Sequence, residues 1–480
     1  MTHILQIIFL AFLTLGLISC APKVSRDELP KRPNIVFIFT DDMRTDDLAY
    51  MPKTQALIEE EGATFEHYYA NVALCAPSRA SVLTGLYAQN HEIYDAEAPN
   101  GGFERVYESG LEQSTLAVWL DNAGYNTGLF GKYFATYPNT AEPTYIPPGW
   151  DEWNSPSAGY PYDGYDYILN ENGVLVEYGS EEDDYITDVL ADKSTAYIEN
   201  ALKQGDPFFA YIATYAPHKP STPAPRHLGM FRTLELPRPP SFNEDNMGDK
   251  KKSMLWRDRL TEEDIQYLEE HYRLRAESLQ AIDEMVAEIF TILDEAGQLE
   301  NTYIFFSSDQ GIQYGEHRLV EKKNWPYIES VGSPLLIMGP GIRQGISIDN
   351  ITGNIDIAPT IAELAGVPSA AFVDGRSLLP LLLNEKVEWR DAYLIQRAIT
   401  DAELSENADW YGLRTERYLY LEFVNDGDTQ IYDLKKDPYE LENIAQTTDK
   451  ELLEEYHQWL ENLRSCAADE CRNFDTEPGK

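Results

Sequence analysis

The chain has 480 residues, of which 43% are hydrophobic and 25% are charged, enough for a large buried core and for more than one domain. Its 81 acidic and 38 basic residues give a net charge of −43. Such a charge repels nucleic acid and anionic membrane surfaces, so we expect neither to be a partner. An anionic ligand would require positive side chains concentrated in one place.

The N-terminus has the pattern of an export signal. An apolar run from Ile4 to Leu17 is followed by Ile18-Ser19-Cys20, and Leu17 to Cys20 resembles the bacterial lipoprotein cleavage box. We therefore expect residues 1–20 to be a signal peptide, Cys20 to be lipidated and residues 21–32 to form a linker. The protein would be exported and lipid-anchored to a bacterial membrane, facing the periplasm or the cell surface. A plain signal peptide with an incidental cysteine is the alternative.

Four short segments lack alternation of polar and apolar residues, which is typical of strands buried on both faces of a parallel sheet. They are PNIVFIFTDD, YNTGLFGKY, PFFAYIATYAPH and TYIFFSSDQG. Helical patterns at residues 115–123, 187–202 and about 274–296 complete an α/β architecture, in which ligands bind beyond the carboxyl ends of the strands. The four segments deliver the following polar residues to that edge: Asp41, Asp42, Lys132, His218, Asp309 and Gln310.

Other parts of the chain predict loops and a second unit. Residues 137–184, dense in Tyr, Pro and Gly, and residues 216–260, rich in Pro and basic residues, are expected to be long loops. Beyond about residue 384, residues 411–423 and 429–432 predict hairpin strands and residues 450–463 a helix. We therefore divide the chain into a main domain, residues 33–384, and a smaller C-terminal α+β subdomain, residues 385–480.

The remaining cysteines fall into two kinds. Cys466 and Cys471, close together in SCAADEC, could form a local disulfide in an exported protein. Cys75, in LCAPSRASVLTG, would then be unpaired, and Pro77 and Ser78 place it at the start of a helix, where amide groups and the helix dipole favour anions. Taken alone, it could be a thiolate nucleophile or a small residue packed at a helix start.

The motif around Cys75 is more specific than its local structure. Cys75-Ala76-Pro77-Ser78-Arg79, followed by Thr84-Gly85, resembles the signature of the type I, formylglycine-dependent sulfatases. GKY, APH, SDQG, GEHRL and IYDLKKDPYELEN extend the resemblance from residue 33 to the C-terminal hairpin, and their order is nearest to that in the glucosamine-6-sulfatase and heparan endosulfatase branch. The resemblance implies an alkaline-phosphatase-like sandwich with a large, mostly parallel central sheet flanked by helices, and residues 33–384 as the catalytic domain.

The resemblance also implies a chemistry for Cys75. In this family a formylglycine-generating enzyme or an anaerobic sulfatase-maturating enzyme oxidises the cysteine to formylglycine. One hydroxyl of the hydrated aldehyde attacks sulfur, and the second later expels the sulfate. We therefore expect hydrolysis of sulfate esters on a carbohydrate, either a glycosaminoglycan or an algal polymer such as ulvan.

A single Ca²⁺ ion would assist, because carboxylate and amide oxygens suit a hard cation. Its expected ligands are Asp41, Asp42, Asp309 and Gln310, although the family usually has Asn or His where Gln310 stands. The expected catalytic side chains besides Cys75 are Arg79, Lys132, His218 and Lys323, with Lys322 as the rival of Lys323. Lys132, His218 and Lys323 would bind sulfate oxygens, and His218 would also protonate the leaving group or relay a proton.

Further residues carry weaker signals. His91 and His317 are candidate substrate-binding residues, and Trp150, Trp153 and residues 160–167 could stack on sugar rings or pack within the loop. Two other functions stay open: a phosphodiesterase or phosphonate hydrolase of the same superfamily, and a non-catalytic polysaccharide-binding lipoprotein.

Overall fold

The computed structural model describes residues 25–250, 257–397, 410–424 and 427–478. The expected signal peptide, the lipidation of Cys20 and the first part of the linker lie outside these residues. Among the helices within these ranges, none combines the length and the apolar character that crossing a bilayer demands.

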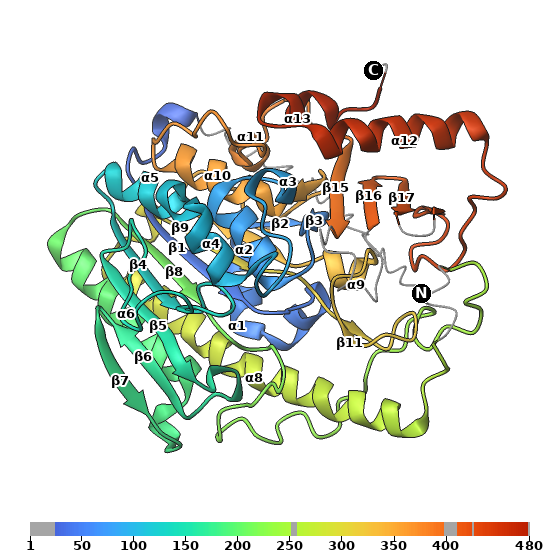
Figure 1. The fold of residues 1–480 in the computed structure, drawn as a ribbon. Coiled ribbons are helices and arrows are strands. Elements are labelled where there is room, and N and C mark those ends of the chain that lie inside the picture. The colour runs from blue at the N-terminus through green and yellow to red at the C-terminus, as the bar shows by residue number, and fades with distance from the viewer. Residues whose placement is uncertain (1–24, 251–256, 398–409, 425–426, 479–480) are drawn as a thin grey trace, which may run out of the picture.

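A ten-stranded mixed sheet forms the centre of the molecule, in the order β13-β2-β12-β9-β1-β8-β4-β5-β6-β7 (Figure 1). Its middle is parallel: β9 (Thr302–Ser308), β1 (Asn34–Thr40), β8 (Phe208–Ala213), β4 (Asn126–Gly131) and β5 (Glu152–Gly159) are hydrogen-bonded in succession. These strands include all four that the sequence predicts. The predicted α/β fold with a large, mostly parallel sheet is confirmed.

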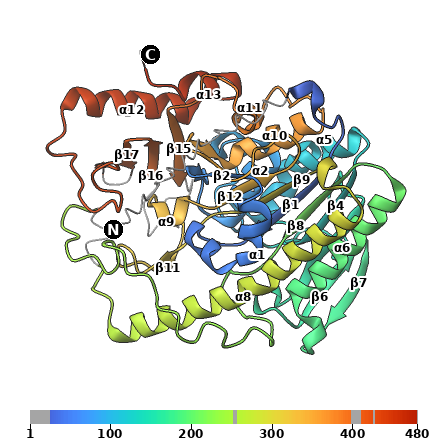
Figure 2. The same ribbon diagram turned by 180° about the vertical axis from the view of Figure 1, so that it is seen from behind.

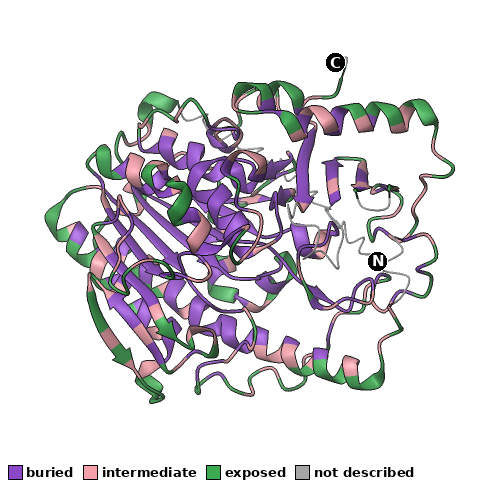
Figure 3. Cartoon of the chain, viewed as in Figure 1, coloured by how far each residue is buried: buried purple, intermediate pink, exposed green. Residues whose placement is uncertain are grey.

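Helices cover both faces of this sheet because alternate side chains of each strand point to opposite sides. On one face Ile35, Phe37 and Phe39 pack in a core with α2 (Cys75–Thr84), α5 (Leu116–Asn122) and α10 (Ile357–Leu364). On the other, Val36 and Ile38 pack with α6 (Ile186–Gln204) and α8 (Glu262–Glu295), which Figure 2 shows crossing the back of the sheet. The central strands are buried, whereas the edge strand β7 and the outward helix faces are largely exposed (Figure 3).

The expectation of a long loop over residues 137–184 is wrong. This segment contains β5, β6 (Tyr167–Glu171) and β7 (Val174–Tyr178), which extend the sheet on one side. The many Tyr residues fit a strand edge, whereas the interspersed Pro and Gly hide the strand pattern. Helix α8 also starts earlier than expected, because Thr261 caps it and accepts a hydrogen bond from the Asp264 amide.

The remaining elements are short; β2, β12 and β13 belong to the central sheet, whereas β10 pairs with β11 and β14 with β3. The strands are β2 (Ala63–Phe65), β3 (Tyr68–Tyr69), β10 (Gln313–Tyr314), β11 (Val320–Lys322), β12 (Leu335–Met338), β13 (Ile346–Ile348) and β14 (Thr352–Gly353). The helices are α1 (Pro52–Thr54), α3 (Ala88–His91), α4 (Gly102–Ser109), α9 (Ile328–Val331) and α11 (Leu379–Leu382).

The C-terminal part forms a separate antiparallel sheet of β15 (Ala392–Arg397), β16 (Trp410–Thr415), β17 (Tyr418–Phe423) and β18 (Asp428–Asp433). Helix α12 (Lys450–Ser465) packs on it through Trp459, Leu460 and Leu463, and α13 (Asp469–Phe474) follows. A disulfide joins Cys466 to Cys471, as the sequence suggests, and Cys75 is the free cysteine among the described residues.

Candidate active site

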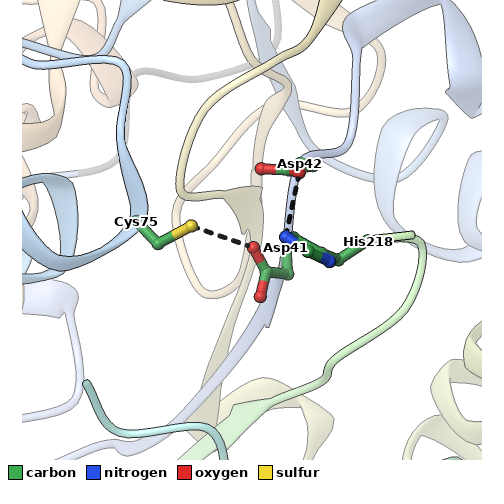
Figure 4. A group of neighbouring side chains, drawn as sticks. All are labelled: Asp41, Asp42, Cys75 and His218. Atoms are coloured by element: carbon green, nitrogen blue, oxygen red, sulfur yellow. Dashed lines mark hydrogen bonds and ion pairs between the residues drawn. The ribbon is translucent and has the colours of Figure 1, made fainter. Parts of the chain in front are cut away.

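The polar residues predicted at the strand ends meet around Cys75. Asp41 and Asp42 follow β1 directly, and their side chains, that of Cys75 and that of His218 have ligand atoms within 4.8 Å of one another (Figure 4). Cys75 Sγ lies 3.5 Å from Asp41 Oδ1, and His218 Nε2 lies 3.5 Å from Asp42 Oδ2. Parallel strands bring these side chains together because their carboxyl ends share one edge of the sheet.

Asp42 has a backbone conformation that non-glycine residues rarely adopt, with φ of 64°. Arg275 of α8, almost fully buried, stabilises this turn: its Nη2 donates to the Asp42 carbonyl at 2.7 Å and its Nη1 to the Pro217 carbonyl at 3.2 Å. Arg275 therefore ties the loop after β1 to the loop that carries His218. Arg275 was not predicted from the sequence, in which its only signal is an arginine within the apolar stripe of a long helix.

The residues of the Cys75 motif have separate structural tasks. Cys75 is the first residue of α2, whose end at Gly85 has φ of 72°, a left-handed conformation that favours glycine. Ser78 Oγ donates to the Asp309 carbonyl and accepts from Asn354 Nδ2 at 2.9 Å. Asn354, which the sequence analysis did not single out, thus holds the serine that positions the end of β9.

Arg79 is completely buried and binds the acidic residues of the site. Its Nε and Nη2 donate to Asp309 Oδ2 at 3.1 and 3.0 Å, and its Nη2 lies 3.8 Å from Asp41 Oδ2. Nη1 donates to the Lys132 carbonyl at 2.9 Å. The guanidinium thus links the ends of three strands, β1, β4 and β9.

Two lysines add positive charge next to Cys75. The Lys132 ammonium contacts Asp41, and the Lys323 ammonium lies 3.0 Å from Cys75 Sγ and 2.8 and 3.0 Å from the two Asp42 oxygens. Lys322, by contrast, is exposed at the end of β11. The geometry therefore favours Lys323 over Lys322.

His218 is largely buried and packs against an aromatic residue. Its Nδ1 pairs with the Lys219 carbonyl at 2.7 Å, which leaves Nε2 toward Asp42. Its ring lies 4.6 Å from that of Tyr162, and the Lys132 ammonium lies 5.1 Å from the same Tyr162 ring. Burial lowers the pKa of His218 although Asp42 and Asp41 oppose this, so the folded protein favours its neutral form.

The acidic residues fit a hard cation. Asp309 Oδ1 accepts from the Asp42 amide at 3.0 Å, and the Gln310 side-chain nitrogen contacts Asp42. Gln310 Oε1 is buried and has no hydrogen-bond partner among the residues that the structure describes. Burial, and then the Asp41 charge, raises the pKa of Asp309 to about 7, whereas Lys132, His218 and Arg79 overcome burial and hold that of Asp41 well below its usual range. Three carboxylates and a free amide oxygen form an oxygen-rich donor set suited to Ca²⁺.

Cys75 itself is not a reactive thiolate. Burial, and then the charge of Asp41, raises the pKa of its thiol to about 12, although Lys132 and Lys323 oppose this. The group is therefore a protonated thiol at neutral pH. The interpretation of an unmodified thiolate nucleophile thus loses its physical basis.

Other candidate residues lie within the protein interior. His91 is buried, with Nε2 3.1 Å from Ser81 Oγ and Nδ1 accepting from the Ile93 amide, so both ring nitrogens have protein partners. His317 is also fully buried, away from solvent. Trp150 and Trp153 pack in the core, which favours the packing alternative for these two rings over sugar stacking.

The fold and this site are those of a sulfatase, and comparison with known protein families gives the same result. The Sulfatase family matches residues 33–367, and the family described as N-sulphoglucosamine sulphohydrolase, C-terminal, matches residues 315–466. The chain belongs to the sulfatase family.

Relatives with names point to one branch of that family. Human N-acetylglucosamine-6-sulfatase is 33% identical over 92% of this chain and 86% of its own length. The extracellular sulfatase SULF-1 homolog of Drosophila melanogaster is 34% identical over 78% of this chain, which spans only 34% of that relative. A solved structure described as a complex with its substrate D-glucosamine-2-N,6-O-disulfate has 27% identity and a TM-score of 0.79, covering 94% of this chain and all of that one. These findings confirm the resemblance stated from the motifs.

Proposed function

We propose that this protein hydrolyses sulfate esters on glucosamine-containing carbohydrates, with a 6-O-sulfated glucosamine of the glycosaminoglycan type as the preferred substrate. The names of the relatives support the substrate class. The observation that carries the reaction is the position of Cys75, whose sulfur lies between the Asp41 carboxylate and the Lys323 ammonium. This arrangement suits a nucleophile that attacks a bound sulfate.

The reacting group is proposed to be formylglycine made from Cys75 by a maturation enzyme. When present, it supplies a hydroxyl for attack on sulfur and another that releases the sulfate. A Ca²⁺ ion held by Asp41, Asp42, Asp309 and Gln310 would supply Lewis-acid polarisation of the sulfate. The matching oxygen-rich donor set supports this choice of metal.

The side chains of this chain then have distinct tasks. Lys132 and Lys323 bind sulfate oxygens and offset the negative charge that grows on them. Both ammonium groups are already close to the site, which supports these roles. Arg79 positions Asp309 and Asp41. His218, with Nδ1 held by the Lys219 carbonyl, has Nε2 available to exchange a proton with the leaving oxygen.

The test is release of inorganic sulfate by the matured enzyme from 6-O-sulfated glucosamine, sulfated glycosaminoglycan oligosaccharides and ulvan oligosaccharides. We expect the first two to be hydrolysed and the Cys75→Ala variant to be inactive on both. Undiminished activity of Cys75→Ala would eliminate the mechanism. Activity on ulvan alone would eliminate the substrate class, and preferential cleavage of a phosphate diester or phosphonate would favour the alternative hydrolase.

The location of the protein is a proposal from its sequence. We propose export and lipidation at Cys20, with residues 1–20 removed. Mass spectrometry of the membrane-bound protein should find a lipid-modified N-terminus at Cys20, and a Cys20→Ala variant should appear in the soluble fraction. An unmodified protein with a free N-terminus elsewhere would refute lipidation.

A further inference from the structure

A second group of potential metal ligands lies apart from the residues around Cys75. A ring nitrogen of His317 and one carboxylate oxygen each of Glu329 and Glu440 lie within 4.8 Å of one another. His317 lies between β10 and β11, Glu329 is in α9, and Glu440 follows β18 in the C-terminal subdomain. The group therefore joins the segment of residues 317–329 to the C-terminal subdomain.

His317 is held in the manner of a metal ligand. It is completely buried, its Nδ1 pairs with Glu244 Oε2 at 2.7 Å, and its ring stacks on that of Tyr327 at 3.9 Å. A carboxylate on Nδ1 fixes the proton there, which leaves the Nε2 lone pair for a metal. Nε2 has no hydrogen-bond partner among the described residues, although a buried ring nitrogen normally has one.

The charges around the group also favour a cation. Arg44 pairs with Asp46 and Glu316, Lys250 with Glu244, and Arg414 with Glu440, whereas Glu329 forms no ion pair in the described part of the chain. The carboxylates Glu244, Glu316, Glu329 and Glu440 thus outnumber the cations Arg44, Lys250 and Arg414, and an excess of negative charge is costly away from water. A divalent ion would neutralise it.

Glu329 lines a cavity of roughly 500 Å³, together with Arg44, Pro239 and Tyr439. Its Oε2 atom is buried and without a hydrogen-bond partner in the described structure, so it is available as a ligand.

We propose that His317, Glu329 and Glu440, with a water molecule as fourth ligand, bind a Zn²⁺ ion that is separate from the expected Ca²⁺ site. One imidazole and two carboxylates suit zinc, whereas Ca²⁺ takes six to eight oxygen ligands. Because Lys323 lies between His317 and Glu329 in the chain, the ion would anchor the catalytic lysine segment to the C-terminal subdomain. His317 would then act through the metal as a positioning residue and not as a substrate-binding residue.

The test measures metal content, without substrate, so its outcome is independent of the proposed function. The full chain is incubated with Zn²⁺, dialysed against zinc-free buffer containing Ca²⁺, and measured by inductively coupled plasma mass spectrometry. We expect about one zinc ion per wild-type chain, and loss of that ion in His317→Ala and Glu440→Gln. The control is His457→Ala, because His457 forms a similar but more exposed group with Glu422 and Glu461; it should retain the zinc.

Two results would overturn the proposal: a wild-type chain that retains no zinc, or a His317→Ala chain that retains as much as the wild type. Because the variants could fail to fold, Co²⁺ is added to the wild type as a second probe. Visible d–d absorption bands that Zn²⁺ abolishes would support the site, and their absence would refute it. In a Glu244→Gln variant the zinc dissociation constant should rise roughly 10- to 100-fold, and an unchanged constant would refute the role of Glu244.

Discussion

Replacing Lys323 by methionine removes one ammonium group and keeps most of the side-chain volume. That group lies 3.0 Å from Cys75 Sγ and 2.8 Å from Asp42 Oδ1, in a site with little access for water. A lost donor to a developing oxyanion lowers kcat by about 10²- to 10³-fold, about 3 kcal/mol. We expect Lys323→Met to lose activity to this extent, because its charge would act directly on the sulfate.

The matched control is Lys322→Met, since Lys322 is the next residue and is exposed. Initial rates of sulfate release are measured for both variants, and circular dichroism and thermal unfolding verify that both are folded. The control should keep nearly the wild-type rate. A folded Lys323→Met enzyme with a near wild-type rate, or a Lys322→Met enzyme with an equal loss, would refute the assignment of the lysine.

Four further predictions follow from the same structure. Arg79→Met should destabilise the fold by about 3–5 kcal/mol in denaturant unfolding, because Asp309 loses its buried partner; a smaller change would mean that Asp309 is neutral. Burial raises the pKa of Glu112 to about 7, from 4.5. Between these two pH values the folded state keeps a proton that the unfolded state loses. The free energy of unfolding of the wild type therefore falls as pH rises from 4.5 to 7. In Glu112→Gln this decrease should be smaller by on the order of 3 kcal/mol, as measured by denaturant unfolding at several pH values in that range. Identical pH dependence of stability in the wild type and the variant would contradict the prediction. Replacing both Cys466 and Cys471 by serine should lower the free energy of unfolding by about 2 kcal/mol, because the disulfide closes a short loop; an unchanged value would mean that the loop is equally ordered without it. A calcium chelator should abolish sulfate release and added Ca²⁺ restore it, whereas full activity in the chelator would exclude the metal.

Several features of the fold could be predicted from the sequence because they depend on local patterns. Unbroken apolar runs predicted β1, β4, β8 and β9 since a strand buried on both faces has no polar positions. Asp41, Asp42 and Asp309 could be placed at one edge because parallel strands end together. The start of helix α2 at Cys75 could be predicted from Pro77 and Ser78, which favour a helix N-terminus.

Other features depend on contacts between distant segments, and only the tertiary structure decided them. Strands β5 to β7 were missed because Pro and Gly interrupt their pattern, and pairing across the sheet stabilises them nonetheless. The contacts of Lys323, which the sequence already favours over Lys322, depend on where the chain leaves β11, and the role of Arg275 depends on the packing of α8 against two loops. Sequence periodicity reports which side of an element is buried. The partner that meets that side is set by the whole chain, and this is why the site's residues were predicted but its supporting contacts were not.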